Sequence, residues 1–341
     1  MVDSVAECVV DSVVDSVAER AAERLAVVIP YYQTRPGILL KAVRSILAQG
    51  GAGADHIIVV DDASPVPARA ELAALPAGQG ARIRIVEQAN AGPAAARNRG
   101  LAEVPEGTEY VAFLDSDDEW TDDHIERARA ALGQGHDFYF ADHFQLDQSV
   151  SAFQRAGRIT PAQHPALAGA AQLHAYAGDM FDQILMGNII GTSTVVYRHA
   201  RFPLLRFREQ FVYAGEDYLF WLELCTLTRR IAFSAQCECR YGAGVNIFSG
   251  SGWGTEKSLL RLHHEIKYQK ALPRLFKLSE PHRAANRRTV SGLRRSFVAD
   301  LLHRLRHRKA IAPALLGQQW RVDPQTFLYS IPLALGIVLK R

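Results

Sequence analysis

Four acidic side chains gather within five residues at the end of an apolar run. The run is YVAFL at 110–114, and the acids that follow are Asp115, Asp117, Asp118 and Glu119. Alternate side chains of an extended strand leave on one face, so we expect Asp115 and Asp117 to converge on one point. Two such carboxylates repel each other unless a cation or a proton lies between them, and oxygen ligands suit Mg²⁺ or Mn²⁺. The motif predicts either a divalent-cation site or an acidic turn that caps the next helix.

Two other segments carry polar residues that suit a nucleotide. Asp61 and Asp62 close the apolar run IIVV and could accept hydrogen bonds from a base or a ribose. Residues 90–100, NAGPAAARNRG, offer Pro93 as a helix-opening residue with exposed backbone donors, and Arg97 could neutralise an anionic ligand. Each segment alone is as easily an ordinary turn or helix start, so its meaning depends on where the fold places it.

The elements that must position these residues form a repeating pattern of strand and helix. Continuous apolar runs predict strands at 25–30, 56–64, 82–88, 110–117 and 137–142, with a further turn and strand at 188–199. Helical spacing predicts helices at 37–49 and 215–227. This alternation indicates an α/β fold with a mainly parallel sheet that is covered on both faces. Ligands of such sheets bind beyond the carboxyl ends of the strands, where the acids fall.

The composition excludes several classes of protein. A chain of 341 residues that is 48% hydrophobic can form a large core, and its net charge of +3 favours no class of partner. Four cysteines are too few for a disulfide scaffold, and the gap between Cys237 and Cys239 does not suit a zinc knuckle, so we expect free thiols in a reducing cytoplasm. No apolar run reaches the roughly 20 residues of a membrane-spanning helix, and the acids within 1–24 argue against a signal peptide.

Taken together and in this order, five segments resemble the family 2 glycosyltransferases with the GT-A fold. They are VVIPYYQ at 27–33, IIVVDDASP at 57–65, NAGPAAARNRGL at 90–101, YVAFLDSDDEW at 110–120 and GEDYLFWLEL at 215–224. The resemblance implies a mainly parallel nucleotide-binding sheet flanked by helices, with a helical C-terminal extension. The chain lacks Gln-x-x-Arg-Trp, because QQWR at 318–321 has these letters in the wrong order. This departure argues against a processive polymerase.

The resemblance also implies residue roles on the donor side. The nucleotide would contact Pro30, Tyr31, Asp61, Asp62, Arg97, Asp115 and Ser116. Asp117 would bind Mg²⁺ or Mn²⁺ directly, and Asp115 would be a second ligand or would meet the ribose or a metal-bound water. A cation on both phosphates stabilises the departing nucleoside diphosphate, which explains why this much negative charge is tolerated.

On the acceptor side the resemblance implies a carboxylate base. A hydroxyl that attacks the anomeric carbon must lose its proton, and in GEDYLF this role falls to Asp217, with Glu216 holding a sugar hydroxyl. Displacement with one base implies inversion at the anomeric carbon, so we expect a metal-dependent hexosyltransferase. From the residues alone, favourable charge at a helix N-terminus is the stronger interpretation of these two acids.

Further residues have less specific signals. Asn188 and Thr192 could line the bottom of the sugar pocket or pack in the core. Trp253 could stack on a sugar ring or anchor its own loop. His263 and His264 could add a metal ligand, although histidines on a polar helix usually are not ligands.

The C-terminal part of the chain is basic. Residues 282–309 hold nine Lys or Arg and one acid, Asp300, and a short apolar stretch follows at 327–339. Such a region suits peripheral attachment to the inner face of the cytoplasmic membrane, where basic residues contribute about 1 kcal/mol each. Few aromatic residues interleave with the basic ones, which argues against a nucleic-acid partner.

We therefore expect three regions, namely an N-terminal extension at 1–24, a GT-A domain at 25–257 and a basic helical region at 258–341. The likeness to exopolysaccharide-assembly glucosyltransferases favours UDP-glucose as the donor. The same likeness favours a growing saccharide on a polyprenyl diphosphate as the acceptor.

Two alternatives remain at this point. A phosphatase or phosphotransferase of the haloacid dehalogenase type also has Asp-x-Asp after an apolar strand, but its first Asp is a nucleophile and normally follows the first strand. The other alternative is a non-catalytic binding protein that kept a GT-A-like fold.

Overall fold

The protein forms two compact units in a computed structural model that describes residues 24–51, 53–76, 78–121, 123–145, 148–168, 171–187, 189–245 and 252–328. The first unit runs to Glu209 and continues over Asp217–Val245. The second unit comprises Gln210–Glu216 and the helical region from residue 252 onward. Residues 1–23 of the expected N-terminal extension lie outside the described residues, as does most of the apolar stretch 327–339. Within the described ranges, none of the helices combines the length and the apolar character that a bilayer crossing requires.

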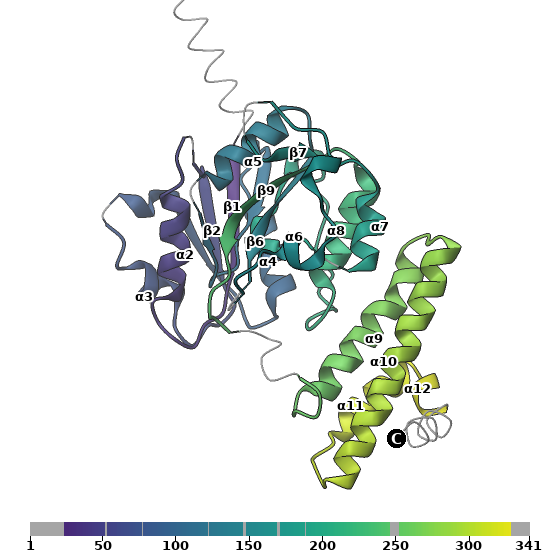
Figure 1. Ribbon diagram of the computed structural model, residues 1–341. Coiled ribbons are helices and arrows are strands. Elements are labelled where there is room, and N and C mark those ends of the chain that lie inside the picture. The colour runs from purple at the N-terminus through teal and green to yellow at the C-terminus, as the bar shows by residue number, and fades with distance from the viewer. Residues whose placement is uncertain are drawn as a thin grey trace, which may run out of the picture. The chain divides into compact units, whose positions relative to one another are not determined.

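Half of the sheet in the first unit is entirely parallel (Figure 1). Its strands lie in the order β3 (Ile83–Glu87), β2 (His56–Asp61), β1 (Leu25–Tyr31) and β4 (Tyr110–Phe113), each hydrogen-bonded in parallel to the next. These strands confirm four of the predicted apolar runs. Parallel neighbours place all four carboxyl ends at one edge, which is where nucleotide-binding sheets hold their ligand.

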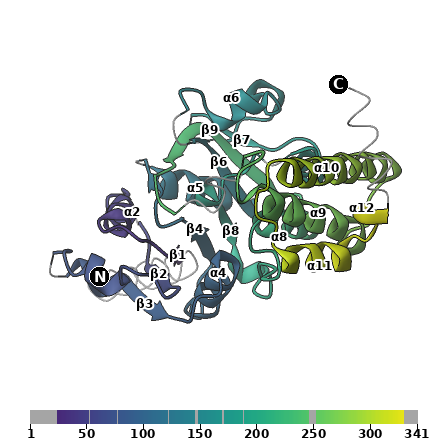
Figure 2. The same cartoon turned by 90° about the horizontal axis from the view of Figure 1, so that it is seen from below.

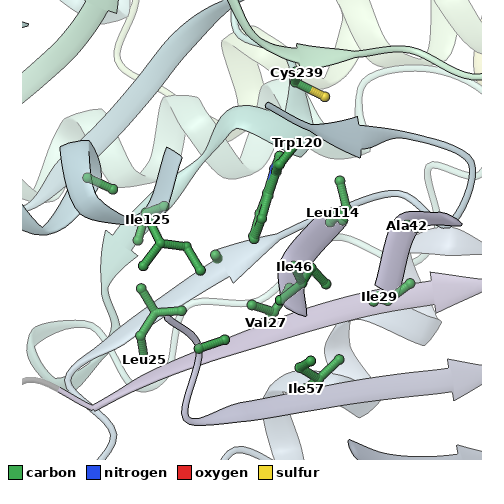
Figure 3. Packing of buried hydrophobic residues seen from close by; sticks show 14 of the residues in the cluster. Leu25, Val27, Ile29, Ala42, Ile46, Ile57, Leu114, Trp120, Ile125 and Cys239 are labelled. Carbon is green, nitrogen blue, oxygen red and sulfur yellow. The ribbon is translucent and has the colours of Figure 1, made fainter. Parts of the chain in front are cut away.

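The alternation of side chains on β1 explains how this half of the sheet is covered. Leu25, Val27 and Ile29 are fully buried in a cluster with residues of α2 (Ile38–Leu47), as Figure 3 shows. Val28 points to the opposite face, where a Cβ on Gly100 of α4 (Pro93–Ala102) would overlap its Cγ1 atom. Helices α2 and α4 therefore cover opposite faces of β1 (Figure 2). A strand buried on both faces needs the continuous apolar run that the sequence shows.

The other half of the sheet mixes both strand directions. Beyond β4 the order continues with β8 (Val196–Arg198), β6 (Phe138–Phe144), β9 (Ile231–Arg240) and β5 (Glu119–Trp120), and β7 (Leu173–Ala175) pairs with β9. Strands β6 and β9 are parallel, whereas the pairs β4 with β8, β6 with β8, β5 with β9 and β7 with β9 are antiparallel. Strand β9 is the longest strand and returns the chain to the edge that carries the acids.

The remaining helices of the first unit are α3 (Ala68–Leu72), α5 (His124–Gly133), α6 (Ala152–Ala156), α7 (Met180–Met186) and α8 (Glu216–Leu227). Helix α8 is anchored by aromatic rings. The Phe220 ring lies 5.8 Å from that of Phe113 on β4, and the Trp221 ring stacks 5.8 Å from that of Phe138 on β6. The described cysteines Cys225, Cys237 and Cys239 are free thiols, as expected.

The second unit has a small helical core of its own. Its helices are α9 (Ser258–Leu275), α10 (Glu280–Arg306), α11 (Pro313–Val322) and α12 (Gln325–Leu328), which confirms the helical C-terminal extension. Leu259, Leu262 and Ile266 of α9 cluster with Phe297 of α10. A buried Asp323 is held by ion pairs to Lys270 and Arg294, each at 2.6 Å, so this buried charge is compensated.

Candidate active site

The acidic motif lies on a turn rather than on a strand. Strand β4 ends at Phe113, and the backbone N–H of Asp118 donates to the Asp115 carbonyl at 3.0 Å. The prediction of a strand to residue 117, with Asp115 and Asp117 on one face by alternation, is therefore wrong. The chain turns because the Asp115 N–H donates to the Ser193 hydroxyl at 3.0 Å instead of to a neighbouring strand.

Each acid of this turn has a different partner. Asp115 accepts from Arg97 at 2.6 Å and keeps a side chain that is 33% exposed. Asp117 accepts the backbone N–H of Gly244 at 3.0 Å. Asp118 is buried and accepts from the Ser193 hydroxyl at 2.5 Å and from the Gly242 N–H at 3.0 Å. Asp118 thus holds the turn together, while Asp115 and Asp117 are the acids that remain partly exposed.

The pKa values reflect this crowding of carboxylates. Burial, and then the charge of Asp115, raise the pKa of Asp117 to about 6. Burial also raises the pKa of Asp118 well above its usual value, with smaller contributions from Asp115 and Asp117. A divalent cation would relieve the repulsion at Asp117 and Asp115. No group of three His, Cys, Asp or Glu in the described part of the chain is arranged to hold a metal.

Arg97 is positioned by α4, which begins at the predicted Pro93. Gly92, the residue before Pro93, adopts a φ of 88°, and its N–H donates to the Asp62 carboxylate. The Arg97 guanidinium is buried, and its carbon lies 5.3 Å from the centre of the Phe207 ring. The predicted contact of Arg97 with a nucleotide stays a prediction, because the observed contact is to Asp115.

Asp61 and Asp62 shape the loops at the end of β2. The Asp61 carboxylate accepts the N–H groups of Ser64 and Ala68, each at 2.8 Å. Asp62 accepts from the Gln88 side chain and from the N–H groups at 91 and 92, all at 2.8 Å. Both side chains are buried. Asp61 fixes the turn that leads to α3, and Asp62 joins β2 to the loop before α4. The predicted contacts of both residues with a base or ribose stay predictions.

The end of β1 is tied to the same loops. Pro30 and Tyr31 are the last residues of β1, and the Tyr31 hydroxyl donates to the Val66 carbonyl at 2.7 Å. The buried Gln33 donates from its side chain to the Ser116 hydroxyl at 3.2 Å and from its backbone to the Ser64 hydroxyl at 2.8 Å. Gln33 was not predicted as a site residue, although it connects the ends of β1, β2 and β4.

Asp217 lies in the first turn of α8 and interacts with the charges of the acidic turn. Burial raises its pKa to about 6, Arg97 opposes this shift, and Asp115 adds to it. The pKa of the partly buried Tyr241 rises well above its usual value because of burial first and then of neighbouring acidic groups, which include Asp118, Asp115 and Asp217. The charges of Arg97 and Asp115 therefore both act on the Asp217 carboxylate. Glu216 precedes Asp217 as the first residue of α8.

The segment that follows β9 was missed by the sequence analysis. Residues 242–245, here called the glycine strap, hold both Asp117 and Asp118 through backbone N–H groups. The strap is held in turn by residues that follow β1. The Val245 N–H donates to the Gln33 side chain at 3.1 Å, and Arg35 donates to the Ala243 carbonyl at 2.8 Å. The pair of glycines in YGAG was the only signal in the sequence.

The strap requires glycine at 242, which gives a prediction. A Cβ there would lie 2.7 Å from the Asp117 carbonyl carbon and would overlap its oxygen. We expect Gly242→Ala to displace the strap, break the bond to Asp118 and lower the free energy of unfolding by about 1–3 kcal/mol, measured by urea denaturation. Gly50→Ala is the matched control, because no atom lies within 4 Å of a Cβ at that position. Equal stability of the two variants would contradict this account.

The structure describes four of the residues whose sequence signals were less specific. Thr192 is buried at the start of a single 3-10 turn, and Trp253 lies in the second unit with its ring 4.7 Å from that of His303. His263 bonds to Gln319 at 2.7 Å, and the His264 ring lies 4.6 Å from that of Tyr213, so both have partners other than a metal. Asn188 lies outside the described residues.

Solved structures share this fold. The mannosyltransferase PcManGT from Pyrobaculum calidifontis, in complex with GDP-Man and Mn²⁺, matches with a TM-score of 0.53 at 14% identity, over 93% of this chain and 88% of that one. S. aureus TarS 1–349 in complex with UDP-GlcNAc matches with a TM-score of 0.52 at 15% identity, over 91% and 82%. At such low identity these likenesses establish the GT-A fold of a glycosyltransferase and nothing finer.

Sequence relatives narrow the class to a family. The family described as Glycosyl transferase family 2 matches residues 26–198, and this chain belongs to that family. Succinoglycan biosynthesis protein ExoW of Rhizobium meliloti (strain 1021) is 34% identical over 231 residues, 66% of this chain and 70% of that protein. An uncharacterized glycosyltransferase of Rickettsia conorii is 28% identical, and the chain spans only 34% of its length. Membership of this family removes the haloacid dehalogenase alternative.

Proposed function

We propose that this chain is an inverting, metal-dependent hexosyltransferase that moves glucose from UDP-glucose to a hydroxyl of a lipid-linked saccharide in surface polysaccharide assembly. One observation carries the proposal. The charge of Asp115 contributes to raising the pKa of both Asp117 and Asp217, which supports assigning the proposed donor-side and acceptor-side carboxylates to one site. That arrangement suits a displacement reaction in which one carboxylate binds the cation that stabilises the leaving group and another accepts the proton of the attacking hydroxyl.

On the donor side, Asp117 and Asp115 would hold Mg²⁺ or Mn²⁺. When bound, such a cation supplies Lewis-acid stabilisation of a departing nucleoside diphosphate. Arg97 holds Asp115 in place at 2.6 Å and brings a buried positive charge to the site. The loops fixed by Asp61 and Asp62 would receive the nucleoside, beside Pro30, Tyr31 and Ser116 at the same edge of the sheet.

On the acceptor side, Asp217 would accept the proton of the attacking hydroxyl. A carboxylate with a pKa of about 6 is a stronger base than an ordinary aspartate and is still ionised at neutral pH. Glu216 would hold a sugar hydroxyl. Attack assisted by one base, with no covalent intermediate on the protein, inverts the configuration of the anomeric carbon.

The names of related proteins support the choice of substrates. Besides ExoW, they include a putative teichuronic acid biosynthesis glycosyltransferase, TuaG of Bacillus subtilis, which is 28% identical over 71% of this chain and 88% of that protein. Amylovoran biosynthesis glycosyltransferase AmsB of Erwinia amylovora is 27% identical over 61% and 64%. The TarS complexes with UDP and UDP-GlcNAc support a UDP-sugar, whereas GDP-Man in PcManGT keeps GDP-sugars as the competing donors.

We assign donor and acceptor chemistry to residues 25–257 and surface attachment to 258–341. Exposed basic residues of α10 support attachment to an anionic leaflet, and they include Arg283, Arg287, Arg288, Arg295 and Arg306. The protein would then work on the cytoplasmic face of the membrane, where a polyprenyl diphosphate acceptor is anchored. Co-sedimentation with phosphatidylglycerol vesicles but not with phosphatidylcholine vesicles checks this attachment, and equal sedimentation with both would refute it.

A donor screen tests the enzymatic proposal. The full chain is incubated with Mn²⁺ and with UDP-glucose, UDP-galactose or GDP-mannose, and nucleoside diphosphate release is measured with and without a membrane extract. We expect release from UDP-glucose that requires the extract and stops with EDTA. Release from another donor would correct the sugar. Tight UDP-glucose binding without release in any extract would favour the non-catalytic binding protein.

A further inference from the structure

The seven residues before Asp217 are bound by helix α9 of the second unit. The Lys267 ammonium donates to the Gln210 carbonyl and lies 5.2 Å from the centre of the Phe211 ring. The Tyr213 ring lies 4.6 Å from the His264 ring. Phe211 is buried, so this segment is fixed rather than solvated. Residues 210–216, here called the α8 leader, therefore pack on α9 of the second unit immediately before the chain enters α8.

Gly215 of the α8 leader lies next to the Tyr268 ring. Gly215 has a φ of +87°, a conformation that favours glycine. A Cβ there would lie 2.7 Å from Cγ and 2.9 Å from Cε2 of the Tyr268 ring. Tyr268 is 7% exposed, so its ring has little room to move away. The ring therefore packs close to the backbone two residues before Asp217.

Helix α9 uses opposite faces for two purposes. His264, Lys267 and Tyr268 are three and four residues apart, so they share one face, and that face binds the α8 leader. Leu259, Leu262 and Ile266 follow the same spacing on the opposite face and form the helical core with Phe297. The face of α9 that binds the α8 leader is therefore separate from the face that forms the helical core.

We propose that α9 positions the acceptor-side carboxylates, with Tyr268 acting on Asp217 through the backbone of Gly215. This inference rests on the proposed role of Asp217 as the base. Gly215 is two residues from Asp217, and α8 begins between them, so a shift of the leader at Gly215 is carried along the peptide chain to the first turn of α8. A misplacement of about 1 Å at a reacting group can cost 100-fold in rate. On this proposal, α9 acts on Asp217 only through the chain that joins Gly215 to α8.

Tyr268→Ala in the full chain tests this inference by separating turnover from donor binding. We expect kcat for transfer to the acceptor to fall about 10- to 100-fold. The donor KM and the Mn²⁺-dependent Kd for UDP should stay within twofold, because Asp115 and Asp117, the proposed cation ligands, are unchanged in this variant. Tyr268→Phe should restore most of kcat, since ring carbon atoms make the contact with Gly215. Lys267→Ala, on the same face but outside the helical core, should give a smaller loss of about two- to fivefold.

Ile266→Val is the matched control on the core face of α9. It should lower stability in urea without changing kcat, because Ile266 belongs to the cluster with Phe297. An unchanged kcat in Tyr268→Ala, or an equal loss in Ile266→Val, overturns the positioning role. Loss in Tyr268→Ala with full activity in Asp217→Asn would instead refute the base assignment in the proposed function. An inactive Asp217→Asn beside a fully active Tyr268→Ala would keep the proposed function and reject this inference.

Discussion

Asp217→Asn is expected to lower the rate of sugar transfer by roughly 10²- to 10⁴-fold, the usual contribution of a general base. Asparagine keeps the shape of the side chain and cannot accept the hydroxyl proton. Affinity for UDP with Mn²⁺ should stay within twofold, since Asp115 and Asp117 are intact. The rate is measured as product formed at saturating donor and acceptor, and the affinity by titration calorimetry. Loss of both quantities together would place Asp217 on the donor side instead.

Glu223→Gln is the matched control for this substitution. Glu223 lies on the same helix and pairs with Arg208 at 2.9 Å, with both side chains about one-third exposed. Surface pairs of this kind contribute little to stability, so turnover should be unchanged. A large loss in Glu223→Gln would show that α8 responds to any change of charge, and the effect of Asp217→Asn would then not identify a base.

The pH profile gives an independent check on Asp217. Its pKa is raised to about 6, and only the ionised form accepts a proton. We expect log kcat to fall with unit slope below about pH 6 and to be level above pH 7. An aspartate at its ordinary pKa of about 3.9 would keep kcat level down to pH 5. A profile that is level from pH 5 to pH 8 would therefore contradict the assignment.

The parallel half of the sheet was predictable because its strands are buried on both faces. A strand such as β1 must be apolar at every position, and LAVVIPY has that property. The helix at 215–227 was predictable for a related reason, since it is anchored by large apolar side chains such as Phe220 and Trp221. Burial of this extent requires runs of large apolar residues, which can be read directly from the sequence.

The glycine strap could not be predicted in the same way. Its function depends on how closely residue 242 approaches the backbone of Asp117, which is 125 positions earlier in the chain. Any exposed loop would tolerate the same letters, YGAG. The turn at Asp115 escaped prediction for the same reason, because the Ser193 hydroxyl that takes its N–H comes from a distant 3-10 turn. Contacts made by backbone groups are hard to predict from the sequence, because almost any residue type can make them.

Gly215 is a further case in which an ordinary glycine has a specific meaning. In GEDYLF it precedes two acids at a helix start, and the sequence alone favours the interpretation that these acids are favourable charges at a helix N-terminus. The structure adds that residue 215 lies under the Tyr268 ring with a positive φ. The acids are therefore fixed from both sides, by the aromatic anchors of α8 and by the leader.

Asp117→Asn is the second substitution with a large expected effect. Transfer should fall by at least 100-fold, because one of the two proposed carboxylate ligands for the divalent cation is lost and several kcal/mol of leaving-group stabilisation depend on that cation. In wild type, EDTA should stop transfer and added Mn²⁺ should restore it. Calorimetry should show that Mn²⁺ no longer tightens UDP binding in the variant. Full turnover in EDTA would contradict the roles of Asp115 and Asp117 alike.

The free energy of unfolding of the metal-free protein tests the role of Asp117 without any measurement of turnover. The folded pKa of Asp117, about 6, lies above its unfolded value near 3.8. The folded state therefore binds the proton more tightly, so this contribution to stability is present below about pH 4 and is lost as pH rises through 6. Two pKa units set an upper limit of about 3 kcal/mol, and partial exposure reduces it, so we expect Asp117→Asn to gain about 1 kcal/mol at pH 7.5.

The neighbouring Glu119 supplies the control for both measurements. It is exposed on β5, so Glu119→Gln should change neither transfer nor unfolding. Mn²⁺ with UDP should raise the Tm of wild type and of Glu119→Gln by ligand linkage, and should leave Asp117→Asn unchanged. The variant would thus be more stable than wild type without the cation and less stable with it. Only a residue whose charge is costly alone and useful with a bound cation gives that reversal, whereas a purely structural aspartate would destabilise under both conditions when replaced.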